Sequence, residues 1–196
     1  MDENNRSTPA TPYGKSKLRA ENYILSQNIP QNKRVFIIRP CMIHGPGNQG
    51  NLNLLYKIVQ KGIPWPLASF ENKRSFLSID NLNFLIAEMI ENTSVPSGIY
   101  NFADDHPVST NALIRLIAAS ETKKPRMIGV SKKIILRFAK IGDYLRLPLN
   151  SERLKKLTEN YVVSNQKVKN ALKIKNLPLS AEKGLVNTFK SFNSNL

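Results

Sequence analysis

Tyr13 and Lys17 are the residues best placed to do chemistry, because they lie four positions apart in Tyr13-Gly14-Lys15-Ser16-Lys17. On a helix this spacing puts both side chains on one face, about one turn apart. A free phenol, with a pKa near ~10, is a poor base at neutral pH, but a nearby ammonium group stabilises the phenolate and lowers the pKa. Taken alone, the pair also fits an ordinary surface tyrosine and lysine. In a suitable context it predicts an acid/base centre that exchanges a proton with a hydroxyl or a ketone while a hydride moves.

The element that must position this pair is a helix, which we predict over residues 13–26. Thr11 is placed to cap its start, and Pro12 suits the first helical position. The β-branched and aromatic run at 34–38 predicts a buried parallel strand that ends at Pro40, where it would deliver residues to a site.

The rest of the chain alternates helices and short strands. We expect a helix at 52–60 whose apolar positions are Leu52, Leu55, Tyr56 and Val59. Further helices are expected from Asp80, as the cap, through Ile90, from Ser109 or Thr110 through Ala119, at 165–172 and at 180–192, and further strands at 65–67, 75–79 and 98–103. Residues 131–157 are helix-like, with interruptions at Gly142 and Pro148. This order predicts a mixed α/β protein with too few strands for a complete doubly wound sheet.

Composition limits the classes of function. The chain of 196 residues is 41% hydrophobic, enough for one domain or two small lobes. Its single cysteine, Cys41, cannot form an internal disulfide, and its two histidines, His44 and His106, give no metal-ligand cluster. The longest apolar runs are far shorter than the ~18 residues that indicate a membrane span. No signal-peptide pattern opens the chain, so we expect a soluble, cytoplasmic protein.

The formal net charge of +15 favours an anionic partner such as nucleic acid, a membrane surface or a phosphorylated small molecule. The basic residues are spread through helix-like segments without a zinc-finger, RNP or GxxG signature, so nucleic acid is not the expected partner. The apolar and basic segment at 132–140 has two interpretations, a helix on an anionic membrane and a partly buried helix with a solvated basic edge. We favour the second.

Several motifs recur in a fixed order along the chain. They are Pro9-Ala10-Thr11-Pro12-Tyr13-Gly14-Lys15-Ser16-Lys17, Arg39-Pro40, Gly45-Pro46-Gly47, Arg74-Ser75-Phe76 with Asp80, and Ile99-Tyr100-Asn101. Together they resemble the NAD-dependent epimerase/dehydratase family, the extended branch of the short-chain dehydrogenases. The resemblance implies an α/β fold with a partial Rossmann-type sheet and a small mixed α/β substrate-binding lobe.

The resemblance also implies roles for particular residues. Tyr13 would be the acid/base, and Lys17 would also hold the nicotinamide ribose of NAD or NADP, with Pro40 and Ile43 on the cofactor side. Arg74 would clamp the diphosphate of a UDP-sugar substrate, which suits its rigid fork of donors. The other substrate-binding positions would be Met42, Asn51, Leu52 and Asn101.

One departure from the family is large, since no GxxGxxG turn occurs in the sequence. Those glycines let the backbone approach the cofactor pyrophosphate, so without them NAD binding by this chain alone is doubtful. We therefore expect a C-terminal portion that is truncated and inactive alone. Residues 1–45 would be the remnant of the Rossmann-type domain with the catalytic helix, and residues 46–196 mainly the substrate lobe, with some segments returning to the Rossmann sheet. A homodimer or a complementing N-terminal chain would then be its protein partner.

A second departure keeps the reaction open. Many UDP-hexose 4-epimerases have an asparagine where this chain has Met42, and an apolar residue there looks more like reductases of UDP-4-keto sugars in polysaccharide biosynthesis. The leading hypothesis is a UDP-sugar 4-epimerase, with the NAD(P)H-dependent reductase as its alternative. A non-catalytic remnant that binds a nucleotide sugar or a partner is the alternative of another class. His44 has two interpretations, a second acid/base and a packing residue, of which we favour packing.

Overall fold

The computed structural model describes residues 1–5, 8–48, 50–145 and 150–193. Its helices are α1 (Pro12–Leu25), α2 (Asn51–Gln60), α3 (Ile79–Glu91), α4 (Thr110–Ser120), α5 (Lys132–Leu145), α6 (Ser151–Thr158), α7 (Gln166–Leu172) and α8 (Ala181–Asn193). Its strands are β1 (Phe36–Pro40), β2 (Met42–His44), β3 (Phe76–Ser78) and β4 (Gly98–Phe102). None of these helices is both long and apolar enough to cross a membrane.

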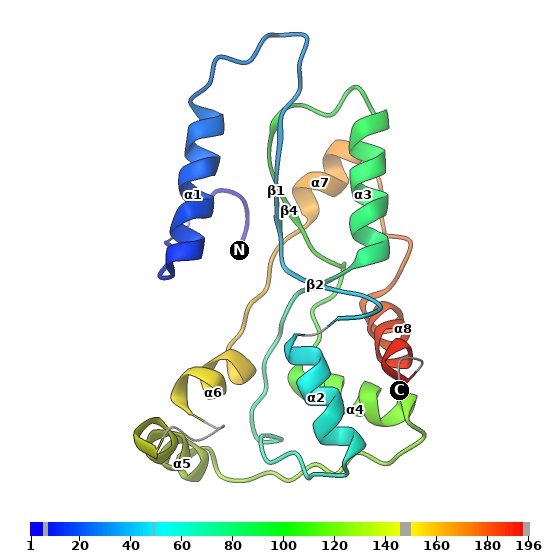
Figure 1. The fold of residues 1–196 in the computed structure, drawn as a ribbon. Coiled ribbons are helices and arrows are strands. Elements are labelled where there is room, and N and C mark those ends of the chain that lie inside the picture. Colours follow the sequence, from blue (N-terminus) through cyan, green and yellow to red (C-terminus); the bar gives the residue numbers. More distant parts are fainter. Residues whose placement is uncertain (6–7, 49, 146–149, 194–196) are drawn as a thin grey trace.

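Two parallel strand pairs form the centre of the molecule. β1 pairs with β4, with Phe36 opposite Gly98, and β2 pairs with β3, with Met42 opposite Phe76. The parallel strands of each pair are joined by long connections that contain helices, as parallel pairing requires. In Figure 1, α3 and α7 lie beside the β1–β4 pair, while α2, α4 and α8 gather at the other end.

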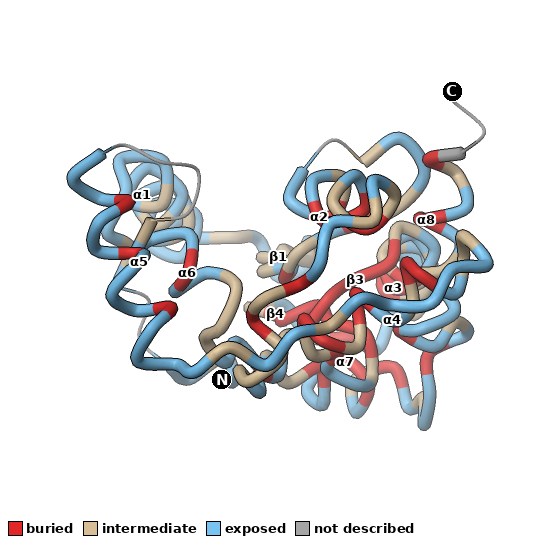
Figure 2. The backbone as a smooth tube through the Cα atoms, turned by 90° about the horizontal axis from the view of Figure 1, so that it is seen from below, coloured by how far each residue is buried: buried red, intermediate tan, exposed pale blue. Residues whose placement is uncertain are grey.

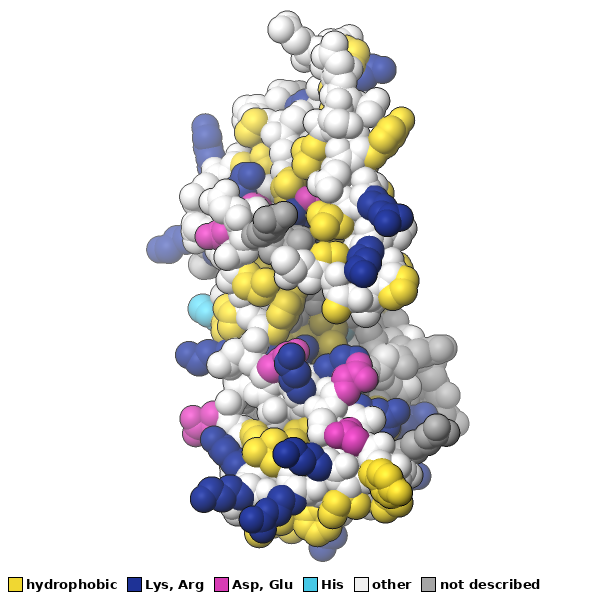
Figure 3. Space-filling model, turned by 90° about the vertical axis from the view of Figure 1, so that its left-hand side faces the viewer, with side chains coloured by type: hydrophobic (Ala, Val, Ile, Leu, Met, Phe, Trp, Pro, Cys, Tyr) yellow, Lys and Arg dark blue, Asp and Glu magenta, His cyan; other side chains and the backbone are white. Residues whose placement is uncertain are grey.

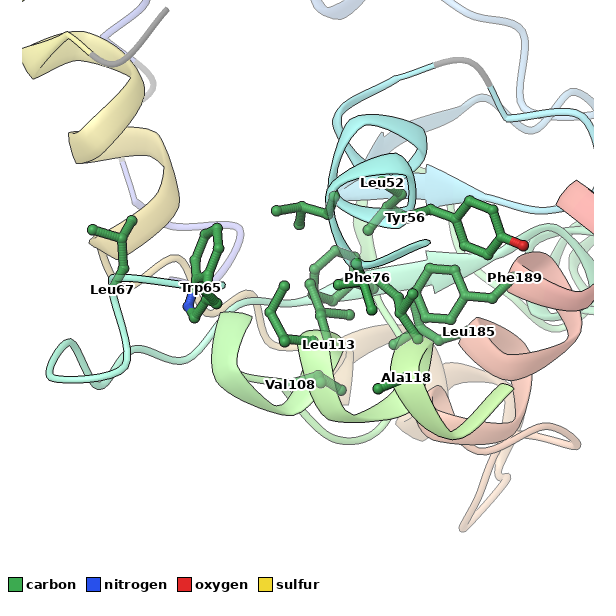
Figure 4. Close-up of a cluster of buried hydrophobic side chains, with 14 of the residues drawn as sticks. Leu52, Tyr56, Trp65, Leu67, Phe76, Val108, Leu113, Ala118, Leu185 and Phe189 are labelled. Atoms are coloured by element: carbon green, nitrogen blue, oxygen red, sulfur yellow. The ribbon is translucent and has the colours of Figure 1, made fainter. Parts of the chain in front are cut away.

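Two clusters of buried side chains hold these layers together. One lies between α2, α4 and α8 and includes Leu52, Tyr56, Leu113, Leu185 and Phe189, as Figure 4 shows. The other packs α3 and α7 against β4 and includes Leu85, Met89, Tyr100, Phe102 and Val168. Buried residues concentrate around β3, β4 and α4, whereas the helices at the opposite end, including α5 and α6, are largely exposed (Figure 2). The burial of Leu52, Leu55, Tyr56 and Val59 confirms the apolar face expected for α2.

The start of α1 is confirmed, because the Thr11 hydroxyl accepts a hydrogen bond from Gly14 N and Pro12 occupies the first turn. The prediction of a buried first strand is wrong in two respects. β1 begins at Phe36 rather than at residue 34, and its residues are half-buried or exposed. The physical reason is that, among the described strands, only β4 pairs with β1 and no residue of α1 is buried.

Two other boundaries also differ from expectation. Ser78, not Asp80, caps α3, because the Ser78 hydroxyl accepts the Asn81 N–H and leaves Asp80 exposed in the first turn. Gly142 does not interrupt α5, since it is one of the residues that the helix buries and its lack of a side chain permits close packing. Pro148 lies outside the described residues.

Asp105 fastens α7 to the end of β4. Its carboxylate accepts hydrogen bonds from Lys169 Nζ at 2.6 Å, Leu177 N at 2.8 Å and Asn165 Nδ2 at 3.0 Å. Burial alone would raise the pKa of this carboxyl, but the three donors outweigh it and hold the pKa of Asp105 below its usual value. The ionised carboxylate is therefore favoured in the folded state.

We predict that Asp105 contributes an acid-sensitive part of the stability. Because its pKa is lower in the folded than in the unfolded chain, the contribution is complete above the unfolded value, about 4, and disappears as the pH falls through the folded value. Asp105→Asn should lower the urea midpoint at neutral pH, and the difference should narrow toward about pH 3. Asp80→Asn, which alters an exposed carboxyl, is the control. A difference that does not change with pH would contradict the assignment.

Candidate functional site

α1 brings the phenol and the ammonium together as the spacing predicts. Lys17 Nζ lies 5.4 Å from the centre of the Tyr13 ring. Tyr13 is 73% exposed, so its hydroxyl is open to a ligand and is not committed to packing. Where the pair lies relative to the rest of the molecule depends on how α1 is held in place.

An ion pair supplies that attachment. Arg39, on β1, donates from Nη2 and Nε to the two carboxylate oxygens of Glu21 on α1, and its Nη1 also reaches the Glu3 carbonyl. The hydrogen bond to Glu21 raises the pKa of the Arg39 guanidinium, against the opposing effect of burial. This two-point contact fixes the direction of α1 as well as its distance from β1.

A cavity of about 500 Å³ opens between α1 and the carboxyl ends of β1 and β4. Lys17 on α1, Pro40 on β1 and Asn101 on β4 all line it. Asn101 N donates to Glu3 Oε1 at 2.7 Å, so the N-terminal residues form part of its wall. The structure thus brings together three of the residues identified from the sequence.

A second cavity, of about 240 Å³, lies under α2. Four residues identified from the sequence line it, namely Met42, Asn51, Leu52 and Arg74. The sequence analysis missed the others, among them Trp65 and the α6 residues Arg153 and Lys156. In the sequence, the only signal for these α6 residues is a basic, helix-like segment. That pattern does not indicate that α6 approaches Arg74. An apolar pocket with cations suits a molecule that has a flat ring and an attached phosphate group.

Arg74 is fixed by α6. Its Nη1 donates to the Lys156 carbonyl and lies 4.0 Å from Glu159 Oε1. The guanidinium has five N–H donors, so these contacts leave others for an anion. Arg74 is therefore positioned in advance, which lowers the entropic cost of using it to bind a ligand.

The two cavities are neighbours. Arg74, which lines the smaller cavity, pairs with Tyr161, which lines the larger one, in an isolated parallel bridge. Ser75 N donates to the Tyr161 carbonyl at 2.8 Å and holds the two segments together. Arg74 and Lys17 therefore line adjacent cavities.

The structure does not bring every expected residue into these cavities. Tyr13 and Ile43 are not among the lining residues, and Ile43 is 39% exposed. His44 is buried, with Nδ1 2.9 Å from Thr188 Oγ1 and Nε2 3.7 Å from Asp104 Oδ2. The packing interpretation of His44 is therefore confirmed. In the described part of the chain, no three His, Cys, Asp or Glu residues gather as metal ligands.

The chain is similar in sequence to known proteins. Residues 2–129 match the 3-beta hydroxysteroid dehydrogenase/isomerase family. The chain is 37% identical over 116 residues to UDP-glucose 4-epimerase of Vibrio cholerae, a match that covers 59% of this chain and 35% of that protein. It is 30% identical over 125 residues to the N-acetyl-alpha-D-glucosaminyl-diphospho-ditrans,octacis-undecaprenol 4-epimerase of Escherichia coli O157:H7, covering 63% of this chain and 38% of that protein. These matches span little more than a third of either relative.

Solved structures show the same fold. UDP-glucuronic acid 4-epimerase of Bacillus cereus in complex with NAD aligns with a TM-score of 0.69 at 15% identity, over 99% of this chain and 56% of that chain. MoeE5 in complex with UDP-glucuronic acid and NAD aligns with a TM-score of 0.68 at 16% identity, over 100% of this chain and 60% of that chain. The expected α/β, partial Rossmann-type fold is confirmed.

Fold and motifs together define a protein of the Rossmann-type epimerase/dehydratase class, which confirms the resemblance read from the sequence. Within that class, the chain belongs to the 3-beta hydroxysteroid dehydrogenase/isomerase family.

The residues present fit an NAD molecule only in part. Of the residues expected on the cofactor side, Lys17 and Pro40 line a common cavity. The glycine-rich turn that cradles a dinucleotide pyrophosphate is not in the sequence. We therefore assign no step of a reaction to a cofactor held by this chain alone.

We predict that Arg39→Ala loosens α1. Hydrogen bonds to charged groups contribute about 1.5–3 kcal/mol, so amide hydrogens of α1 should exchange about tenfold faster or more, while those of the buried α4 keep their rates. Arg19→Ala, which alters an exposed side chain of α1, should leave exchange unchanged. If Arg39→Ala leaves α1 equally protected, contacts other than the Glu21 pair hold the helix.

Proposed function

We propose that the chain supplies the acid/base helix and the substrate cavity of a UDP-sugar 4-epimerase, an enzyme that oxidises and re-reduces C4 of the sugar. The observation that carries the proposal is the adjacency of the two cavities, with Arg74 at one and Lys17 at the other. A diphosphate at Arg74 would direct the attached sugar toward α1. NAD, when bound, would accept and return the hydride, and residues outside this chain would hold its pyrophosphate.

The residues of the chain divide the work between binding and proton transfer. Trp65, Leu52 and Leu113 give the smaller cavity an apolar wall that suits a base, and Arg74 holds the diphosphate. Tyr13 takes the proton from the sugar hydroxyl and returns it, and Lys17 stabilises the phenolate. The sequence similarity to two 4-epimerases, both named for sugars on a diphosphate, supports this substrate class.

The second candidate is a one-way reductase of a UDP-4-keto sugar. Met42 favours it, because this thioether lines the smaller cavity where many 4-epimerases have an asparagine. The reductase would use the same residues, with Tyr13 giving a proton to the ketone. The two reactions differ in cofactor balance, since a reductase consumes NAD(P)H stoichiometrically and an epimerase has no net consumption.

We predict that the chain binds UDP and that Arg74 recognises its diphosphate. Trp65, the single tryptophan, lines the cavity and should report binding by its fluorescence. Losing charge-assisted hydrogen bonds should make Arg74→Ala bind UDP about 10- to 100-fold more weakly. Arg74→Lys should fall between, because an ammonium group does not form the two-point contact.

Two comparisons make this test specific. Arg115→Ala removes an exposed cation of α4 that does not line the cavity and should bind UDP as the unaltered chain does. Uridine lacks the diphosphate, so Arg74→Ala should scarcely affect its binding. An equal loss for uridine and UDP would show that Arg74 acts only by holding α6.

We predict activity when the chain is combined with the part of the Vibrio cholerae UDP-glucose 4-epimerase that its match to this chain does not cover. Interconversion of UDP-glucose and UDP-galactose, with no net use of NAD, would support the epimerase. Tyr13→Phe should reduce the rate about 100-fold or more, because it removes the acid/base group. Stoichiometric use of NAD(P)H would instead support the reductase. UDP binding without turnover in a complex that binds NAD would support a non-catalytic binding protein and contradict both enzymes.

A further inference from the structure

α5 has an apolar stripe that the rest of the molecule does not cover. Ile134, Phe138, Ile141 and Leu145 recur at helical spacing on one face, and they are 46%, 60%, 50% and 56% exposed. A neighbouring face packs inward instead, where Ile135, Ala139 and Gly142 are buried. The partial burial expected for this segment is confirmed, but it uses only part of the apolar surface.

A basic edge runs beside this stripe. Lys133, Arg137 and Lys140 are exposed at helical spacing, and none forms an ion pair with a described carboxylate. Asp143, the one acidic residue of α5, instead accepts hydrogen bonds from the N–H and hydroxyl of Ser151 on α6. The edge is therefore positively charged. Figure 3 shows hydrophobic surface beside Lys and Arg side chains at the lower end of the face on which α5 lies.

The position of α5 links this surface to the candidate site. α5 packs against α6, and Arg153, Lys156 and Leu157 of α6 line the smaller cavity. α5 lies at the outer end of that lobe, away from the β1–β4 pair (Figure 1). A flat surface could therefore contact α5 without meeting the strands.

We propose that α5 docks the protein on an anionic lipid bilayer. The apolar stripe would enter the boundary between headgroups and acyl chains, and Lys133, Arg137 and Lys140 would contact anionic headgroups. α5 has 14 residues, which is too short to span a bilayer, so it would lie in the plane of the surface.

Charge decides between this occupant and the other possibilities. A second copy would bring its own Lys133, Arg137 and Lys140 to the same contact, and like charges would repel in a chain whose net charge is already +15. Nucleic acid would use the cations but leave Ile134 and Phe138 exposed to water. An anionic bilayer satisfies both halves of the surface.

We predict that the full 196-residue chain floats with vesicles of phosphatidylcholine and phosphatidylglycerol and not with phosphatidylcholine alone. The double variant Phe138→Ser with Ile141→Ser should weaken partition into anionic vesicles about tenfold or more. The reason is that two apolar side chains would no longer enter the boundary between headgroups and acyl chains. Ile90→Ser is the matched control, since Ile90 is 65% exposed on α3. Equal flotation with both vesicle types, or none with the anionic ones, would overturn the proposal.

Two triple variants that have the same net charge as each other test the basic edge. Lys133, Arg137 and Lys140 are changed to Glu in one triple variant, and the exposed Lys175, Lys183 and Lys190 are changed to Glu in the other. Only the α5 triple should lose flotation if that edge makes the contact. Equal losses would mean a general charge effect and refute the assignment to α5.

Fold and oligomeric state are checked on the same samples. Unchanged circular dichroism and an unchanged UDP titration would show that a loss of flotation is local to α5. The unaltered chain should sediment without a dimer that forms through the α5 stripe. A dimer that Phe138→Ser dissociates would assign the stripe to a second copy and overturn the bilayer proposal.

Discussion

The ion pair between Arg39 and Glu21 is the contact on which the position of α1, and with it that of Tyr13 and Lys17, depends. α1 buries no residue, so hydrophobic packing contributes little to its position, and the two-point hydrogen bond to β1 sets where the phenol and ammonium lie. The other wall of the larger cavity has a different support, because β4 is held by the buried cluster around Tyr100 and Phe102. A polar contact thus aligns a weakly packed helix with a well-packed strand.

Local patterns predicted the elements well where the governing physics is local. The Thr11 cap and the apolar spacing of α2 depend on residues a few positions apart, and both agree with the structure. Ser78, not Asp80, is the N-cap of α3, because the N-cap is the residue that still has extended backbone geometry where the chain leaves β3. The prediction that the first strand is buried was wrong for a tertiary reason. Its burial requires neighbouring strands on both edges, and the described strands provide a neighbour, β4, on one edge.

In the candidate site too, local contacts were predicted from the sequence and long-range contacts were not. The Tyr13–Lys17 contact follows from helical spacing alone, whereas the role of α6 depends on a hydrogen bond between Arg74 and the carbonyl of a residue 82 positions later. No periodicity reports such a contact. Family resemblance located Met42, Asn51 and Leu52 near each other, but their shared cavity also requires Trp65, whose indole N–H is held by Asn111. Long-range hydrogen bonds therefore shape the part of the site that the sequence did not predict.

How the chain accommodates 29 basic residues against 14 acidic ones bears on the ligands it can bind. Several cations donate to backbone carbonyls at or near the ends of helices. Arg34 donates to the Ile90 and Asn92 carbonyls at the end of α3, Lys123 to the Gln60 carbonyl of α2, and Arg74 to the Lys156 carbonyl of α6.

The C-terminal end of a helix carries partial negative charge and carbonyls without partners, so such a contact stabilises both groups. It also differs from a salt bridge in one respect, because a neutral acceptor leaves the full positive charge in place. Arg74 combines such a carbonyl contact with a carboxylate at 4.0 Å, Glu159 Oε1, so its guanidinium is oriented by both groups. An anionic ligand would then meet a guanidinium that is already oriented and has further N–H donors, which is the physical basis for the diphosphate role proposed for Arg74.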